Sequence, residues 1–398
     1  MRLNCKLMFM RYISRSAEKF VRDSLDNRKI LFLLGARQVG KTTLIEHILN
    51  TGEGEMLNMD AQIDQARFKD ASELEPIEGV RALTSGKVLV IDEAQRVPHI
   101  GRITKGWYDA RVPVKIILLG SSSASLASIA ASELVGRNEK LWLTPLLFEE
   151  VLAGQKWFSE TRTPQQLQKS FPKQVQAILM QRLIFGSYPE AFLTDDSRTY
   201  LENLTSDYLL KDIFTKSLVR SPEDVRRLLL ELTREIGATV SVLQLATRLK
   251  LSRQTVQRYL DLLEGIFVIF KIPAYYTDVA TEVTKSYKYY FWDTGVKNAL
   301  QREWTVSTKR SDIDALWENW VVAEIMKLSR TYRRHEDLFF WRSRHGSNVE
   351  LVVKQGSKLH PFNICFDSLM AKPSRAFANA YGVEPKIIYP DNILEFIL

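Results

Sequence analysis

The sequence predicts an α/β fold that begins with a parallel sheet. Three predominantly apolar runs of strand length, 30–34, 87–91 and 114–119, are typical of strands that are buried on both faces. Each run ends in glycine or in acidic residues, and a helical pattern follows the first run over residues 43–49. Because ligands of open α/β sheets bind at the carboxyl ends of parallel strands, a functional site is expected at these strand ends.

The composition is that of an ordinary globular protein. With 398 residues, 45% of them hydrophobic and 26% charged, the chain is long enough for two or three domains. No apolar stretch approaches the length of about 18 residues that spans a bilayer, and the N-terminus lacks a secretory pattern. Cys5 and Cys365 have no metal-ligand spacing around them. We therefore expect a cytoplasmic protein with no membrane contact, whose net charge of +8 allows a polyanionic partner without requiring one.

The first apolar run leads into a phosphate-binding motif. Residues 35–42 match the spacing G-x-x-x-x-G-K-T, in which backbone N–H groups and a helix N-terminus surround the phosphates of a nucleotide. We expect Lys41 to contact the β- and γ-phosphates and Thr42 to bind Mg²⁺. The nucleotide-binding residues that the motif predicts are Gly35, Ala36, Arg37, Gln38, Val39, Gly40, Lys41, Thr42 and Thr43.

Two acidic residues, Asp92 and Glu93, follow the second apolar run. In a site that hydrolyses nucleotides, Asp92 would hold Mg²⁺ directly or through water, and Glu93 would polarise the attacking water. The alternative is a solvated strand end without a catalytic role. The phosphate-binding motif about fifty residues upstream favours the catalytic interpretation.

Two further candidates lie beyond the third run. Ser121 follows that strand and could hydrogen-bond the γ-phosphate or the attacking water, although its Gly-Ser-Ser-Ser segment could also be a simple turn. Arg137 follows a helical pattern over 124–134 and could stabilise the transferring phosphoryl group, in its own site or in that of a neighbouring subunit. The alternative for Arg137 is an ordinary surface position.

Seven segments together carry a family resemblance, namely 35–43, 91–98, 119–123, 134–137, 143–150, 186–190 and 208–212. They resemble a large group of prokaryotic AAA-like ATPases. In that group an ATPase domain precedes a winged helix and a C-terminal domain of unknown function (DUF4143) related to PD-(D/E)XK nucleases. The resemblance implies ATP rather than GTP, and a sensor role for Ser121. The sequence departs from the group at Leu119, where a threonine is usual.

The resemblance implies three domains: an AAA-like ATPase domain at 11–200, a helical and winged-helix domain at 201–278, and a nuclease-like domain at 279–398. In the middle domain a short helix precedes a helix over 252–263, whose apolar face packs inward, and residues 266–272 could form the wing. The outer face of that helix includes Arg253 and Arg258, which could contact DNA. The alternative is a structural module with a solvated polar face.

The C-terminal domain is not expected to cleave nucleic acid. A helix over 317–328 and strands at 337–342, 349–353 and 362–366 fit a nuclease-like core. Aligned on the family motif, Glu350 takes the aspartate position, but the next strand carries Asn363 and Cys365 where a metal-binding carboxylate and a lysine are needed. Asn348 also replaces an acid. We expect a docking or structural module.

The sequence thus predicts a Mg²⁺-dependent ATPase that couples its nucleotide state to the winged-helix and C-terminal regions. One alternative is a DNA-binding regulator that holds ATP as a ligand with little turnover. Another is a partner-binding scaffold of the toxin-antitoxin or defence kind. A homo-oligomer would be required if Arg137 acts in a neighbour's site, and the sequence identifies no protein partner.

Overall fold

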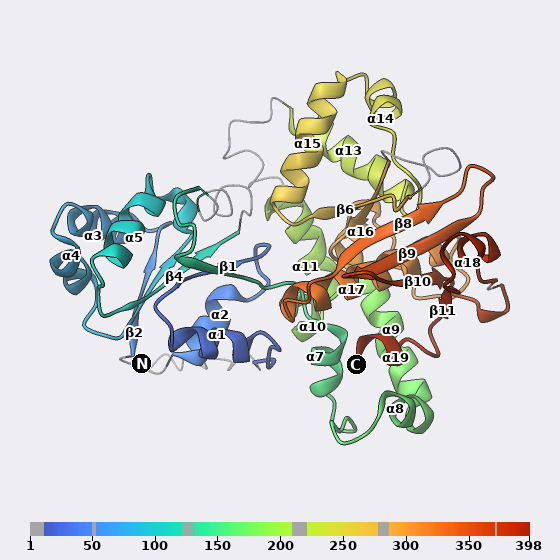
Figure 1. Cartoon of the computed structure of the whole chain (residues 1–398), viewed down its shortest axis with the longest axis horizontal. Helices are drawn as coiled ribbons and strands as arrows, with labels where there is room; N and C mark the ends of the chain where they lie inside the picture. Colours follow the sequence, from blue (N-terminus) through green and yellow to red (C-terminus); the bar gives the residue numbers. More distant parts are fainter. Residues whose placement is uncertain are drawn as a thin grey trace, which may run out of the picture.

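The computed structural model describes residues 12–49, 53–121, 129, 132–208, 221–277, 286–370 and 372–398. The N-terminal sheet and its helices lie on one side of the molecule, and the later helices and the C-terminal sheet lie on the other (Figure 1). None of the helices in these ranges has the length and apolar character needed to cross a membrane.

The N-terminal sheet has five strands in the order β2-β3-β4-β1-β5, and every neighbouring pair is parallel. The predicted parallel α/β fold is therefore confirmed. All residues of the two strands β1 and β4 are buried, as continuous apolar runs require. The strands are β1 (Ile30–Leu34), β2 (Gly54–Asn58), β3 (Val88–Asp92), β4 (Lys115–Gly120) and β5 (Asn138–Trp142).

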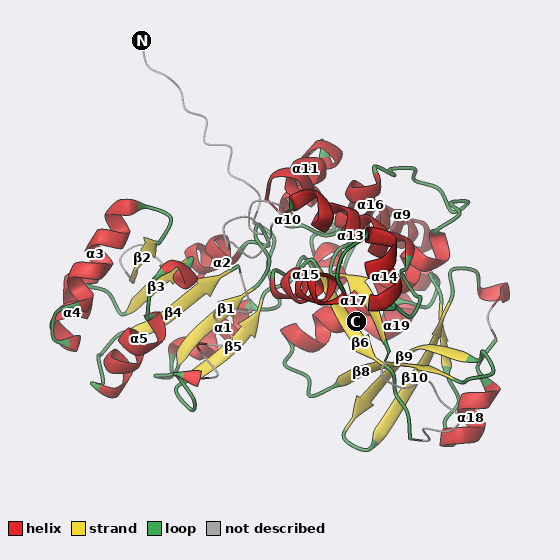
Figure 2. Ribbon diagram, turned by 90° about the horizontal axis from the view of Figure 1, so that it is seen from above, coloured by secondary structure: helices red, strands yellow, loops and turns green. Residues whose placement is uncertain are grey.

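Helices cover this sheet on both faces (Figure 2). The helix that follows the phosphate-binding motif begins at Lys41, two residues earlier than predicted, because Gly40 adopts the left-handed φ of 90° that ends the loop. The predicted helix at 124–134 lies largely outside the described residues. The described helices are α1 (Glu18–Leu25), α2 (Lys41–Ile48), α3 (Gln62–Ser72), α4 (Pro76–Leu83) and α5 (Ile100–Asp109).

The middle of the chain is mainly helical. Helices α14 and α15 match the predicted helix pair, and the predicted wing strand is β6, which pairs antiparallel with β7. The sequence also predicts a helix over 205–219, and much of this range lies outside the described residues. The helices are α7 (Phe148–Ala153), α8 (Pro164–Ser170), α9 (Pro172–Phe185), α10 (Pro189–Leu193), α11 (Ser197–Asn203), α13 (Pro222–Arg234), α14 (Val242–Leu249) and α15 (Arg253–Gly265), and the strands are β6 (Ile269–Pro273) and β7 (Tyr287–Phe291).

A mixed sheet in the order β11-β10-β9-β8 forms the C-terminal part, with three antiparallel strands and a parallel fourth. The long helix α17 packs beneath it, and 14 of its 19 residues are buried, so it is enclosed on nearly all sides. The elements are α16 (Thr294–Gln301), α17 (Ile313–Thr331), β8 (Asp337–Arg342), β9 (Asn348–Gln355), β10 (Lys358–Ile364), α18 (Arg375–Tyr381), β11 (Lys386–Ile388) and α19 (Leu394–Ile397).

Helix α17 carries two buried charges that contact the segment joining β5 to α7. Glu324 accepts a hydrogen bond from the backbone N–H of Phe148 (2.5 Å), and Lys327 donates one to the carbonyl of Leu146 (2.9 Å). The two side chains also pair with each other, Nζ to Oε2, at 2.5 Å. The segment that joins β5 to α7 is thereby fixed by C-terminal residues.

A second, partly buried ionic group lies where α16 meets the start of α17. The Asp312 carboxylate accepts hydrogen bonds from Arg310 Nε and Nη2, both at 2.8 Å, and it pairs with Lys297, whose side chain is 1% exposed. Burial acts to raise the pKa of the Asp312 carboxyl, but the bonds from Arg310 and Lys297 outweigh it and hold that pKa well below its usual value.

We expect Asp312→Asn to lower the free energy of unfolding by about 1 to 2 kcal/mol at pH 7, because it leaves two buried cations without their acid while solvent partly screens the carboxylate. Since the pKa is lowered on folding, this stabilisation is present above the pKa of the unfolded chain, about 4, and is lost as the pH falls below it. Urea unfolding at pH 7, 5 and 3 should show the difference shrinking only in the acid sample. The exposed Asp23→Asn should change little, and a pH-independent difference would contradict the prediction.

Candidate functional site

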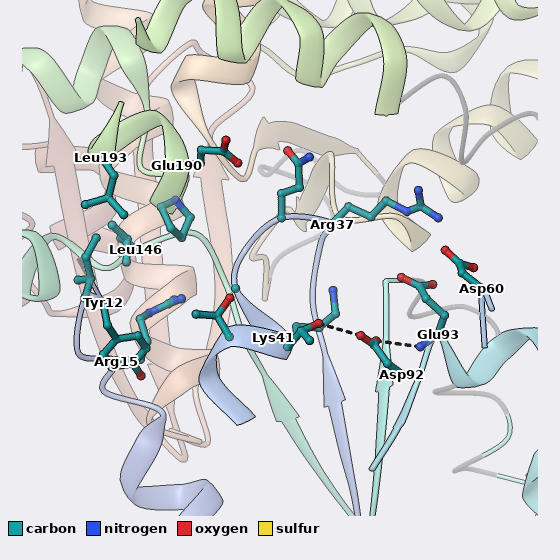
Figure 3. A pocket seen from close by; sticks show the side chains of 16 residues that line it. Tyr12, Arg15, Arg37, Lys41, Asp60, Asp92, Glu93, Leu146, Glu190 and Leu193 are labelled. Atoms are coloured by element: carbon teal, nitrogen blue, oxygen red, sulfur yellow. Dashed lines mark hydrogen bonds between the residues drawn. The ribbon is translucent and has the colours of Figure 1, made fainter. Parts of the chain in front are cut away.

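A cavity of about 380 Å³ lies at the carboxyl ends of the N-terminal strands (Figure 3). The phosphate-binding loop, the two acids at the end of β3 and the segment around Pro189 line it, together with residues that precede α1. The three strands β1, β3 and β4 run in the same direction, so the loop after β1 and the acids after β3 reach the same edge of the sheet. The structure therefore brings the main sequence-predicted residues together.

Close packing fixes the loop at its first glycine. A Cβ added at Gly35 would lie 2.0 Å from the carbonyl oxygen of Leu143, so only glycine fits there. Lys41 is 6% exposed, and its Nζ donates to the carbonyls of Gly35 (2.9 Å) and Ala36 (2.8 Å). The ammonium group is thus already held inside the curve of the loop, where a phosphate would need a positive charge.

Thr42 and Asp92 meet directly. The Thr42 hydroxyl donates to Asp92 Oδ2 at 2.7 Å, and Asp92 Oδ1 accepts from the backbone N–H of Glu93 at 2.8 Å (Figure 3). A hydroxyl and a carboxylate are hard oxygen donors, the kind that Mg²⁺ binds through one or two protein ligands while it keeps waters and phosphate oxygens. This pair of side chains therefore fits a magnesium ion.

Glu93 follows Asp92 of the Thr42–Asp92 pair, with a left-handed φ of 52° that turns the chain into a short 3₁₀ helix at Ala94–Arg96. Its Oε2 accepts a hydrogen bond from the Gln95 amide and another from the Ser121 hydroxyl at 3.3 Å. The structure thus joins Ser121 to Glu93. Gln95 was not among the site residues predicted from the sequence. Its position two residues after Glu93 was the signal that could have indicated this contact.

Arg137 lies away from this cavity. It precedes β5, and its carbonyl accepts a hydrogen bond from Ile30 at the start of β1, so it sits at the amino edge of the sheet. The five residues of β1 rise about 3.3 Å each, which puts the loop roughly 16 Å away. Arg137 Nε pairs instead with Asp109 Oδ1 at 2.7 Å. Contact with a phosphate in its own site is not supported, and a role in a neighbour's site stays a prediction.

Arg15 contacts the phosphate-binding loop, and this role was not predicted from the sequence. Its guanidinium donates to the carbonyls of Val39 (2.8 Å) and Thr144 (2.7 Å) and pairs with Glu150 Oε2 at 3.0 Å. Arg15 is 6% exposed, so this buried ion pair fixes the second half of the phosphate-binding loop. The contact joins residues 135 positions apart, and no local pattern signals it.

Part of the cavity lining is apolar. Ile13, Leu146, Pro189 and Leu193 line the cavity together with the charged Arg15 and Glu190. The ring of Tyr12 stacks on His47 with centroids 3.7 Å apart. An apolar wall beside a phosphate-binding loop suits the base and sugar of a nucleotide, since ligand pockets combine apolar walls with a few placed polar groups.

The remaining predicted residues lie elsewhere. Arg253 and Arg258 are exposed on α15, so the DNA contact stays a prediction. In the C-terminal sheet, Glu350 Oε2 accepts from the Asn363 amide at 2.8 Å and from the Ile364 N–H at 3.0 Å. Burial, with the nearby charge of Glu318, raises the pKa of Glu350. Within the described ranges, no group of three or more His, Cys, Asp or Glu side chains is arranged to hold a metal.

Comparisons with known proteins agree with this architecture. Residues 27–152 match the model of a family described as an AAA domain, and residues 176–307 and 314–391 match two domains of unknown function, DUF8612 and DUF4143. An uncharacterized protein of Mycobacterium tuberculosis is 23% identical over 372 residues, which cover 91% of this chain and 75% of that protein. Another from Methanocaldococcus jannaschii is 24% identical over 399 residues, which cover 96% of this chain and 85% of the relative.

Among solved structures, the Walker-type ATPase of Pyrococcus abyssi is 18% identical with a TM-score of 0.48, and the match covers 73% of this chain and 96% of that one. The relation of the C-terminal domain to nucleases, the winged-helix assignment and the three domain limits stay predictions. The family matches and the N-terminal parallel sheet agree with one another. The chain therefore carries a match to an AAA domain followed by a match to DUF4143, the order that the resemblance to prokaryotic AAA-like ATPases implies.

Proposed function

We propose that this chain binds ATP with Mg²⁺, hydrolyses it, and transmits its nucleotide state to the C-terminal half. One observation carries the proposal: Thr42 Oγ1 lies 2.7 Å from Asp92 Oδ2, beside Lys41 and Glu93, at one end of a cavity with an apolar wall. A phosphate clamp, a magnesium pair and a water-orienting acid form a sufficient set for phosphoryl transfer, which depends on positioning and charge neutralisation.

Each residue has a distinct role in this proposal. Lys41 exchanges its bonds to the loop carbonyls for the β- and γ-phosphates, and Thr42 and Asp92 hold the metal. The bound Mg²⁺ would neutralise charge that develops on the phosphate oxygens. Glu93 orients the attacking water, and Gln95 and Ser121 set the direction of its carboxylate through the bonds described above.

The contacts around the apolar wall support the proposed coupling. Leu146 N donates to the carbonyl of Ser187 at 2.8 Å, and the N–H of Ser187 donates to Asp293 Oδ2 at 2.6 Å. Lys327 binds the carbonyl of Leu146. Lys327 therefore fixes the cavity wall at Leu146, and Asp293 fixes the segment that leads to Pro189. Hydrogen exchange over 293–301 and 313–331 should differ between ATP-bound and ADP-bound protein, and identical exchange would contradict the coupling.

Weakening the magnesium pair should raise the metal requirement. We expect Thr42→Ala or Asp92→Asn to need at least about tenfold more Mg²⁺ for half-maximal ATP turnover, because each removes one hard oxygen ligand. Phosphate release measured across a magnesium titration tests this. The exposed Thr308→Ala is the matched control, and an unchanged magnesium dependence in both site variants would contradict the assignment.

A second candidate is a DNA-binding regulator that holds ATP without meaningful turnover. The exposed basic and amide side chains on α15, among them Arg253, Gln254 and Arg258, favour it. If wild-type protein retains ATP but releases no phosphate, and DNA affinity follows nucleotide state, this function replaces hydrolysis. A cytoplasmic location and a homo-oligomer stay predictions.

A further inference from the structure

A second cavity, of about 510 Å³, lies between the N-terminal sheet and the C-terminal half. It is lined by β5 on one side, and by β6, the end of α17 and the chain that enters β8 on the other. Figure 2 shows β5 at the edge of the N-terminal sheet that faces these elements. We call it the basic cavity, because its lining includes Lys140, Lys271, Arg330, Arg333 and Arg334.

The positive charges of the basic cavity are only partly compensated. Lys271 pairs with Glu264 at 3.1 Å, and Arg333 approaches Glu139 at 3.8 Å. In the described part of the chain, no acid lies within ion-pair distance of Arg330 or Arg334. The guanidinium of Arg330 lies over an aromatic ring, that of Trp142, 5.4 Å from its centroid, and burial lowers the pKa of Arg330.

The helix dipole accounts for only one of the cations that line the basic cavity. Arg330 is in the last turn of α17, where a cation favours the carbonyl end of the helix dipole. Lys140 and Lys271 come from strands, where no such dipole exists, and Arg334 lies beyond the helix end. The lining contributes two acids, Glu336 and Asp337, against five lysines and arginines, and Lys271 and Arg333 pair with acids outside the lining. Arg330 and Arg334 are therefore the charges that can attract an anion.

We infer that the basic cavity binds a single strand of nucleic acid through its phosphate backbone. Cations from separate elements line one hollow, as a chain of phosphates requires, and the aromatic rings of Trp142 and Phe339 also line it. Single-strand sites combine a positive groove with aromatic faces on which bases stack. A duplex keeps its bases stacked inside and offers none to these rings, so single strands are preferred.

The position of the cavity links this ligand to the phosphate-binding loop. Trp142 pairs with Leu34 at the end of β1. The next residue is Leu143, whose carbonyl oxygen lies so close to Gly35 that it leaves no room for a side chain there. A nucleic-acid strand bound at Trp142 would therefore contact the residue next to Leu143, which itself contacts the phosphate-binding loop. This effect on turnover rests on the proposed ATPase function, whereas binding itself does not require nucleotide.

Fluorescence anisotropy of a labelled oligothymidine, titrated with the full chain without nucleotide at several salt concentrations, tests the inference. We expect Arg330→Gln with Arg334→Gln to weaken binding at least about tenfold at low salt. The salt slope should fall by about 0.7 for each phosphate that the variant no longer neutralises. Arg81→Gln with Arg102→Gln, exposed on α4 and α5, is the matched control and should bind like the wild type. Arg253→Gln with Arg258→Gln tests the competing contact on α15.

A second variant keeps the test independent of folding defects. Glu336→Gln with Asp337→Asn removes the two acids of the lining and should tighten binding severalfold, which a misfolded chain cannot do. Failure of the wild type to bind, equal affinity of the Arg330 and Arg334 variant, or loss of binding only in the α15 variant would overturn the inference. So would inorganic polyphosphate that binds through the cavity while oligothymidine does not.

Discussion

Lys41→Ala is expected to abolish ATP turnover and to weaken nucleotide binding, because it removes the ammonium group that the loop holds for the phosphates. Removal of one preorganised charge from a phosphoryl-transfer site costs on the order of a hundredfold or more in rate. Phosphate release and calorimetric titration of MgATP measure the two effects. Lys87→Ala, at the opposite edge of the sheet, is the matched control.

Glu93→Gln separates chemistry from binding. The amide keeps the shape of the side chain but cannot polarise a water. We therefore expect turnover to fall about as far as in Lys41→Ala, while MgATP affinity stays near that of the wild type. A variant that keeps more than about a tenth of wild-type turnover would show that another group orients the water. Glu73→Gln, exposed at the end of α3, controls for a lost surface charge.

Lys327→Met should destabilise the protein by about 3 to 5 kcal/mol, because it leaves Glu324 buried without its partner and Leu146 without its donor. Burial raises the pKa of Glu324, and the charge of Lys327 opposes that rise, so the acid loses its compensation. Urea unfolding followed by tryptophan fluorescence measures the loss.

The double variant Lys327→Met with Glu324→Gln tests the cause. If the unpaired charge is responsible, the second substitution should recover a large part of the stability, since a neutral amide costs far less to bury than a carboxylate. The exposed Lys309→Met should be nearly neutral. A double variant that is no more stable than Lys327→Met alone would show that packing, not charge, sets the cost.

Local patterns predicted the N-terminal sheet and the closeness of the phosphate-binding loop to Asp92 and Glu93. A strand buried on both faces is a continuous apolar run, and the loop that follows β1 is recognisable from its glycines, Lys41 and Thr42. The acids after β3 were placed correctly beside the loop, because parallel strands end at one edge. Helix ends and strand ends differed by a few residues, since neighbouring elements and backbone φ at glycine set them.

Long-range buried charges could not be predicted. Arg15, Glu324 and Lys327 look in the sequence like ordinary surface residues, yet each is buried against a segment more than a hundred positions away. Arg137 is different, because the direction of the parallel strands was enough to predict that it lies far from the phosphate-binding loop. A residue that precedes a parallel strand lies at the edge opposite the loop, whatever its distance from the motif in the chain.

The buried partners supplied by α17 have a consequence for synthesis of the chain on the ribosome. Glu324 follows its partner Phe148 by 176 residues, which at about 5 to 20 residues per second is roughly 10 to 35 s of translation. During that interval the segment that joins β5 to α7 has left the ribosome while the helix that will cover it has not. The nascent N-terminal half therefore exposes apolar surface that a chaperone can bind before the cavity wall closes.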